Sequence, residues 1–176
     1  MKRSMLVAAV AALSLLAPVA PVNAGTGATC ALEVGVKVLP GISTKPSKGT
    51  FESASGTLAC VGVVKNTPVG GQGKISFAGI YGKGRLAAAQ GGDTCEAGSG
   101  VGSLTASVPK ATGGTLKLTG KFKFERVGSN VLVNGKLGGA TIAGSFQFVP
   151  KVRQDCVQKK VTKATVFGTA LIGSPQ

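Results

Sequence analysis

The fold is decided by a stretch in the second half of the chain, which reads Leu116-Lys117-Leu118-Thr119-Gly120-Lys121-Phe122-Lys123-Phe124-Glu125. Apolar and polar side chains alternate along it, so the leucines and phenylalanines fall on one face of an extended chain and the lysines on the other. Such alternation is typical of a β-strand with one buried and one solvated face. The stretch therefore predicts a strand over residues 116–125.

The same alternation recurs along the chain, whereas helical spacing is almost absent. Glycine, proline, asparagine and serine separate the alternating segments, and Pro68-Val69-Gly70-Gly71 is one of the turns they predict. Asn134-Gly135 favours a two-residue hairpin and could split a strand. Residues 85–90 contain good helix formers and would make one or two turns. We expect about eight strands: residues 32–38, 51–64, 73–81, 99–109, 116–125, 130–137, 141–149 and 157–172.

Regularly spaced short strands predict an all-β fold with antiparallel neighbours. An up-and-down barrel and a sandwich both hide the sheet edges that invite aggregation. Glycines inside strands favour the barrel, because they permit the sharp bends that a closed sheet needs. These glycines are Gly62, Gly79, Gly120, Gly144 and Gly168.

The first 24 residues have the pattern of a secretory signal peptide. Lys2 and Arg3 precede an apolar run from Met5 to Val19, and residues 22–24 suit a cleavage site. We expect a signal peptide over residues 1–24 and a single secreted β domain over residues 25–176. The apolar run is shorter than the roughly 20 residues that cross a bilayer, and no later stretch is apolar enough, so the sequence predicts no transmembrane segment.

Four single cysteines at long spacings fit an oxidising compartment better than a zinc site, because no C-x-x-C pair occurs. If the strands alternate up and down, the first two cysteines lie at one end of the sheet and the last two at the other. We therefore predict two disulfides, Cys30–Cys60 and Cys95–Cys156.

The chain is strongly basic. It carries 20 basic and 6 acidic residues, and without Lys2 and Arg3 of the expected leader 18 basic residues remain, a formal charge of +12. A surface of that charge attracts polyanions such as the anionic polymers of a cell envelope.

Two groups of lysines are candidates for such binding, one on a single face of residues 116–125 and one near the start of the last strand. If those two strands are neighbours, the groups form one basic patch suited to phosphate-bearing polymers. With one tyrosine and no tryptophan, base stacking has little support, and we expect no sequence-specific binding of nucleic acid. The candidate polyanion-binding residues are Lys117, Lys121, Lys123, Lys159, Lys160 and Lys163.

The residue inventory is poor for catalysis, because the chain contains no histidine. That excludes Ser-His-Asp and Cys-His arrangements and histidine-based metal sites. Ser107 and Lys110 match S-x-x-K, a pair that works on a helical turn, but the surrounding alternation places them at a strand end.

Six carboxylates are the remaining candidates for chemistry: Glu33, Glu52, Asp93, Glu96, Glu125 and Asp155. The best pair, Asp93 and Glu96, flanks Cys95, and we expect it to solvate its loop or to pair with Arg85. The sequence predicts neither an enzyme nor a metal or cofactor site.

Several short motifs resemble a loose group of uncharacterised small secreted β-rich proteins of high-GC Gram-positive bacteria. The resemblance implies an extracellular location and a β fold, without implying an activity. The lysine-rich charge departs from the more neutral members, so a polyanion role does not carry over from the group. The motifs are residues 56–60, Cys95 with residues 98–102, residues 144–150, and Asp155-Cys156 leading into residues 165–169.

Three functions fit these observations. The first is a non-enzymatic extracellular binding protein, which holds a small apolar ligand inside the barrel or contacts an anionic envelope through its lysines. The second is a structural or surface protein, and the third is a secreted hydrolase. The small number of aromatic residues argues against a well-lined ligand pocket.

Overall fold

The computed structural model describes residues 27–151 and 154–173, so the expected signal peptide over residues 1–24 lies outside the described residues. No helix in the described part of the chain is long and apolar enough to cross a membrane. The described elements are β1 (Gly27–Ile42), β2 (Gly49–Ser53), β3 (Gly56–Val64), β4 (Thr67–Tyr81), α1 (Arg85–Gln90), β5 (Ala97–Pro109), β6 (Thr115–Val127), β7 (Asn130–Leu137), β8 (Ala140–Pro150) and β9 (Val161–Gly173).

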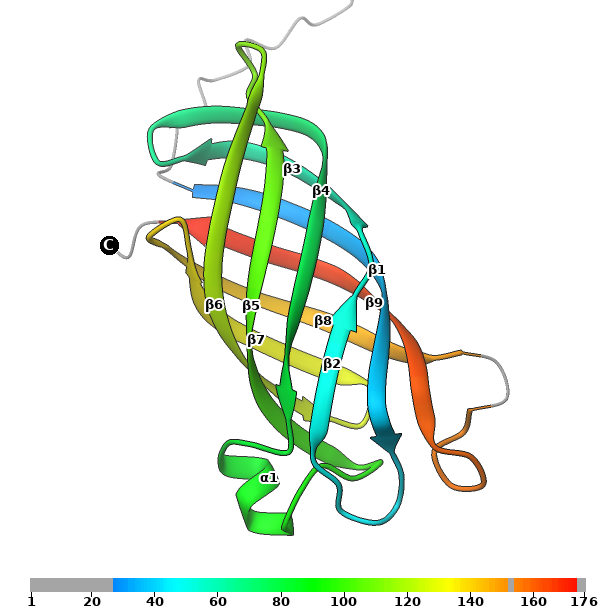
Figure 1. Ribbon diagram of the computed structural model, residues 1–176. Coiled ribbons are helices and arrows are strands. Elements are labelled where there is room, and N and C mark those ends of the chain that lie inside the picture. Colours follow the sequence, from blue (N-terminus) through cyan, green and yellow to red (C-terminus); the bar gives the residue numbers. More distant parts are fainter. Residues whose placement is uncertain (1–26, 152–153, 174–176) are drawn as a thin grey trace, which may run out of the picture.

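The strands form one antiparallel sheet that closes into a ring (Figure 1). From β3 to β9, each strand pairs with the next one along the chain. The ring is closed by β1 and β9, which pair from Gly27 opposite Gly173 to Lys37 opposite Lys163. The predicted all-β, up-and-down barrel is confirmed.

The predicted strand over residues 51–64 is divided into β2 and β3. Both lie between β1 and β4, end to end, so the ring has eight positions. The division is a β-bulge. Ser53 and Thr57 are four residues apart, whereas their partners on β1, Val36 and Glu33, are three residues apart. An extra residue of this kind interrupts the ladder and bends the strand.

The expected turn at Pro68-Val69-Gly70-Gly71 is wrong, and the possible split at Asn134-Gly135 does not occur. Lys65 and Asn66, both with positive φ, make the turn between β3 and β4, and Pro68 lies inside β4. Pro68 is tolerated because the continuous register of β5 on β4 begins only at Lys74, and on this side Pro68 takes part through its carbonyl oxygen, which accepts a hydrogen bond from the N–H of Ala111 (3.0 Å). Asn134-Gly135 does not split its strand and is paired on both sides.

The last strand begins at Val161 and not at residue 157. Asp155 Oδ1 accepts hydrogen bonds from the backbone N–H groups of Gln158 (2.8 Å) and Lys159 (3.2 Å). This side-chain-to-backbone bonding holds the segment in a turn that competes with strand pairing.

The interior of the barrel is built from the apolar side of each alternating strand, and phenylalanine dominates its middle. Phe51 lies 5.5–6.1 Å, centroid to centroid, from the rings of Phe77, Phe122 and Phe124. Strand glycines make room for these rings: a Cβ on Gly102 would lie 2.7 Å from Phe122 Cζ. Glycines in the strands therefore serve close packing inside the closed sheet.

The two ends of the barrel differ in their connections. Given the strand directions, the segments 65–66, 110–114 and 138–139 lie at one end, and all three are short turns. The segments 43–48, 82–96, 128–129 and 154–160 lie at the other end together with α1 (Figure 1). We call this second end the loop end.

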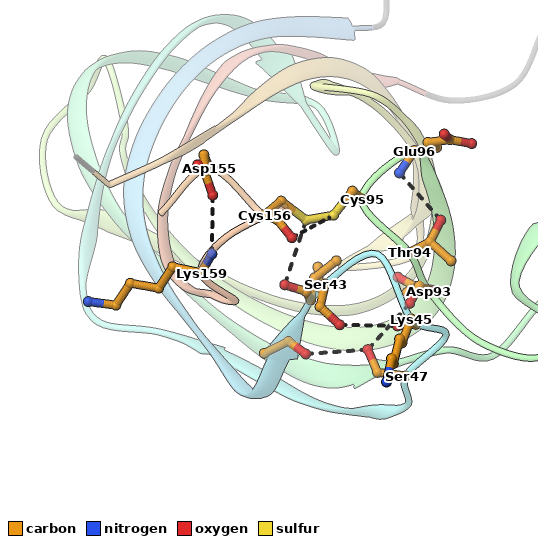
Figure 2. The surroundings of a disulfide bond; sticks show 12 residues. Ser43, Lys45, Ser47, Asp93, Thr94, Cys95, Glu96, Asp155, Cys156 and Lys159 are labelled. Atoms are coloured by element: carbon orange, nitrogen blue, oxygen red, sulfur yellow. Dashed lines mark hydrogen bonds between the residues drawn. A yellow bond between two sulfur atoms is a disulfide. The ribbon is translucent and has the colours of Figure 1, made fainter. Parts of the chain in front are cut away.

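Both predicted disulfides are confirmed, at opposite ends of the barrel. Cys30 and Cys60 are cross-strand neighbours on β1 and β3, and both are buried. Cys95–Cys156 joins the segments 82–96 and 154–160 at the loop end. Figure 2 shows this bond with Asp93 and Thr94 on one side and Asp155 and Lys159 on the other.

Candidate functional site

The interior of the barrel contains a cavity of about 140 Å³. Six of the seven phenylalanines contribute to its wall, so the few aromatic residues of this chain are concentrated in the interior. The expectation of a poorly lined pocket, drawn from the aromatic count, is therefore wrong. These six are Phe51, Phe77, Phe122, Phe124, Phe146 and Phe148.

Two charged side chains also line the cavity, Asp93 and Arg126. Asp93 is fully buried and Arg126 is 4 % exposed. Charged groups are almost never buried to this degree unless they are paired or hydrogen-bonded. The floor that they form at the loop end is our candidate functional site.

Asp93 reaches the interior because the segment after α1 folds back under the barrel. Its Oδ1 accepts hydrogen bonds from the backbone N–H groups of Gly82 (3.1 Å) and Ser99 (2.9 Å). The carboxylate occupies the space that a side chain at Gly98 would fill, so only glycine fits there. Ser99 Oγ in turn accepts a hydrogen bond from the N–H of Ala87 in α1 (3.0 Å).

Arg126 holds the loops of the floor together. Its Nη1 donates to the carbonyl oxygens of Cys95 (3.0 Å) and Gly128 (2.8 Å), and its Nη2 donates to the carbonyl oxygen of Thr94. The guanidinium carbon lies 5.7 Å from the ring centroid of Phe148, a cation–π distance. One side chain of β6 thus fixes backbone in two separate connections.

Asp93 and Arg126 are neighbours without forming a salt bridge within the described part of the chain. Gly98 is opposite Arg126 in the β5–β6 register, and the Asp93 carboxylate fills the space that a side chain at Gly98 would occupy. Each side chain keeps one buried polar atom without a hydrogen-bond partner among the described residues, Oδ2 of Asp93 and Nε of Arg126. A buried donor and a buried acceptor therefore lie on the same floor, and neither opens to the cavity, whose exposed lining is apolar.

Burial governs the electrostatics of the floor. It raises the pKa of Asp93 above its ordinary value. The hydrogen bonds from Ser99 and Gly82 and the positive charge of Arg126 lower this pKa, but burial has the larger effect. Burial likewise lowers the pKa of Arg126, against the attraction of Asp93.

We expect the raised pKa of Asp93 to make stability depend on pH. For a carboxyl group whose pKa is higher in the folded than in the unfolded protein, stability is present in full below the unfolded pKa and is lost as pH rises through the folded pKa. Measured by urea unfolding from about pH 4 upward, the wild type should lose stability relative to Asp93→Asn.

Asp155→Asn is the matched control, because the carboxyl group of Asp155 should change stability with pH in the opposite direction to that of Asp93. Hydrogen bonds from the N–H groups of Gln158 and Lys159 lower the pKa of Asp155. The contribution of Asp155 to stability is therefore present above its unfolded pKa and is lost as pH falls through its folded pKa.

Parallel profiles of stability against pH for the wild type and Asp93→Asn would contradict the prediction.

The expected pairing of Asp93 with Arg85 is wrong. Arg85 is exposed and lies 3.7 Å from Glu125, Nη2 to Oε2. Asp93 is withdrawn into the barrel beside Arg126, whereas Glu96 remains exposed in the loop. Of the six carboxylates, all in the described part of the chain, Asp93 alone lines the cavity.

The two groups of candidate lysines do not form one patch. Lys117, Lys121 and Lys123 are exposed on the outer face of β6, and β7 and β8 separate that strand from β9. The second group is exposed around the start of β9 at the loop end: Lys159, Lys160 and Lys163.

Arg126 was not among the expected site residues, although the alternation along β6 contains a signal for it. In β6 the inward positions are Leu116, Leu118, Phe122 and Phe124, and the next inward position is Arg126. An arginine on the apolar face of a strand indicates a buried charge. Ser107 and Lys110 carry no comparable signal: Ser107 lies in β5, and Lys110 follows its end.

Comparison with protein-family models, with curated proteins and with solved structures gives no match to this chain, so its function is inferred from the geometry of the barrel itself.

Proposed function

We propose that the protein is a secreted, non-enzymatic binding protein that holds one small apolar ligand inside its barrel. The single observation that carries the proposal is the internal cavity of about 140 Å³ with its wall of phenylalanine and aliphatic side chains. An engineered apolar cavity of about 150 Å³ in another protein binds benzene. A cavity of similar volume in this protein should therefore hold a ligand with one six-membered ring. Two disulfides fit the proposed extracellular location.

The distribution of chemical groups supports binding over catalysis. A hydrolase that works with two carboxylates needs both of them at one site. Here Asp93 is in the cavity, while Glu52 lies 3.7 Å from Lys37 and Glu125 lies beside Arg85. The resemblance to small secreted proteins remains a prediction that agrees with this proposal.

We expect that filling the cavity will abolish binding. Ala170 lines the cavity on β9, and Ala170→Leu places a larger side chain there. Titration of toluene, followed by calorimetry and by NMR, should show saturable binding to the wild type and a loss of at least about tenfold in Ala170→Leu. Ala170→Val, a smaller step, should give an intermediate loss.

Ala59→Leu is the matched control. Ala59 is exposed on the outer face of β3, so this variant should bind toluene as the wild type does. Equal affinity in all variants would place the ligand outside the barrel. No saturable binding of any small apolar probe to the folded wild type would favour the structural role instead.

A second candidate, binding of an anionic envelope polymer, is favoured by one observation on the outer face. Lys121 of β6 is directly opposite Lys136 of β7, and both are exposed. Like charges in direct cross-strand contact are destabilising, and a bound polyanion would relieve that repulsion. Attraction of this kind weakens as the salt concentration rises.

A further inference from the structure

We propose that the outer wall formed by β4, β5, β6 and β7 is a binding surface for a linear polymer that carries a phosphate group in each repeat unit. The inference rests on the second candidate function, for which it names the surface and the class of partner. It does not depend on a ligand in the cavity.

The first step is the position of the lysines on this wall. Five exposed lysines point outward from three of the four strands, and none of them forms an ion pair within the described part of the chain. The only acidic residue in these strands, Glu125, lies near the loop end of β6 and is 3.7 Å from Arg85. The five are Lys74 on β4, Lys117, Lys121 and Lys123 on β6, and Lys136 on β7.

The second step is the pattern of side chains between the lysines. Outward positions two residues apart along a strand are about 6.8 Å apart, so they form successive rows across the wall. In three successive rows the lysines alternate with exposed or half-buried hydroxyl groups. The rows are Lys74, Ser107 and Lys117, then Ser76, Thr105 and Thr119, then Ala78, Ser103, Lys121 and Lys136.

The third step is a comparison of two like-charged pairs. Lys121 and Lys136 are directly opposite each other on β6 and β7, which places their Cβ atoms about 5 Å apart. Lys37 and Lys163 are opposite each other in the same way on β1 and β9, but there Glu52 lies 3.7 Å from Lys37. The pair on the wall has no such carboxylate in the described part of the chain. An anion from outside the protein would therefore relieve its repulsion.

The fourth step is the chemistry of the partner. Lysine, serine and threonine side chains all donate hydrogen bonds to phosphate oxygens, and one phosphate group can accept from a lysine and a neighbouring hydroxyl group at once. An extended chain of such groups can follow the rows of the wall. The three rows contain no large apolar side chain to insert between lipids, so they favour a polymer over a membrane surface.

Base stacking has no support at this wall. The exposed phenylalanine, Phe167, is on β9, which is four positions around the ring from β5. The wall therefore has the means to bind a phosphate backbone but not to stack bases.

The test uses long-chain inorganic polyphosphate as the probe and calorimetry at several salt concentrations as the measurement. The triple variant Lys121→Gln, Lys123→Gln and Lys136→Gln should bind polyphosphate about tenfold or more weakly than the wild type at low salt. Each lysine that contacts a phosphate contributes about one to the slope of log Kd against log salt concentration, so this slope should fall by about two to three.

A second triple variant is the matched control, because it removes the same number of charges from the loop end. Lys159→Gln, Lys160→Gln and Lys163→Gln should leave both the affinity and the salt slope close to those of the wild type. Polyglutamate, an anionic polymer without phosphate, should bind the wild type more weakly than polyphosphate. Both triple variants should bind toluene as the wild type does, since the changed side chains point away from the cavity.

The outcomes separate this inference from both candidate functions. Equal weakening in the two triple variants would mean that only net charge matters, and the inference fails. Polyglutamate binding as tightly as polyphosphate would show that the phosphate class is wrong, while the second candidate function stands. Binding to vesicles of phosphatidylglycerol without binding to polyphosphate would make a lipid surface the partner and overturn the inference. If neither polymer binds, the inference and the second candidate function fail together, and toluene binding decides the cavity function independently.

Discussion

Replacing Arg126 with methionine is expected to lower the free energy of unfolding by about 3–5 kcal/mol at neutral pH, because it removes the buried donor of three backbone hydrogen bonds and a positive charge that stabilises Asp93. Methionine keeps much of the apolar stem of the arginine but lacks its positive charge, which stabilises the Asp93 carboxylate. It also leaves the carbonyl oxygens of Thr94, Cys95 and Gly128 without their donor. The loss is measured by urea unfolding.

Two comparisons isolate the cause. Arg85→Met removes the same group from an exposed position, where ion pairs contribute little, so its stability should change little. The double variant with Asp93→Asn should recover part of the loss, because the buried carboxylate is no longer charged. An Arg126→Met protein as stable as Arg85→Met would show that Arg126 does not hold the floor.

Removing the disulfide at the loop end, by Cys95→Ala with Cys156→Ala, is expected to cost roughly 4 kcal/mol. The bond joins residues 61 apart in the sequence, and the chain-entropy model assigns about that much to a loop of this length. Because it ties the segment 82–96 to the segment 154–160, its loss should also speed amide hydrogen exchange in residues 82–96. Urea unfolding and exchange measured by mass spectrometry test both effects.

The other disulfide provides the contrast. Cys30–Cys60 joins residues 30 apart, and Cys30→Ala with Cys60→Ala should cost somewhat less, roughly 3.5 kcal/mol. It lies in the wall between two paired strands, so exchange in residues 82–96 should stay as in the wild type. Equal exchange in the two double variants would mean that Cys95–Cys156 does not support the floor.

The barrel and its disulfides were predictable because they depend on a pattern that repeats along the chain. Alternation in residues 32–38 and 116–125 reports which side of a strand is buried, and the strand order then places the cysteines. The bulge at Ala54-Ser55 was not predictable in this way, since it depends on the register of two neighbouring strands.

The candidate site was predictable only in part, for a similar reason. Arg126 continues the inward series of Phe122 and Phe124, so the alternation alone places it inside. Asp93 has no such signal, because it sits in a loop and is buried only by the way that loop folds back onto Gly98. The aromatic count gave the wrong expectation about the pocket, because composition does not show that the strand topology places six phenylalanines in the interior of one barrel.

The pairing of β1 with β9 also governs the order in which this barrel is assembled. The first and last described strands lie side by side, so the ring stays open until β9 is available (Figure 1). Until then β1 and β8 each present an unpaired edge, and such edges pair readily with other chains. Contacts this distant in sequence also form slowly. Closure of the barrel therefore waits for β9, and both edges stay exposed until that strand has been made.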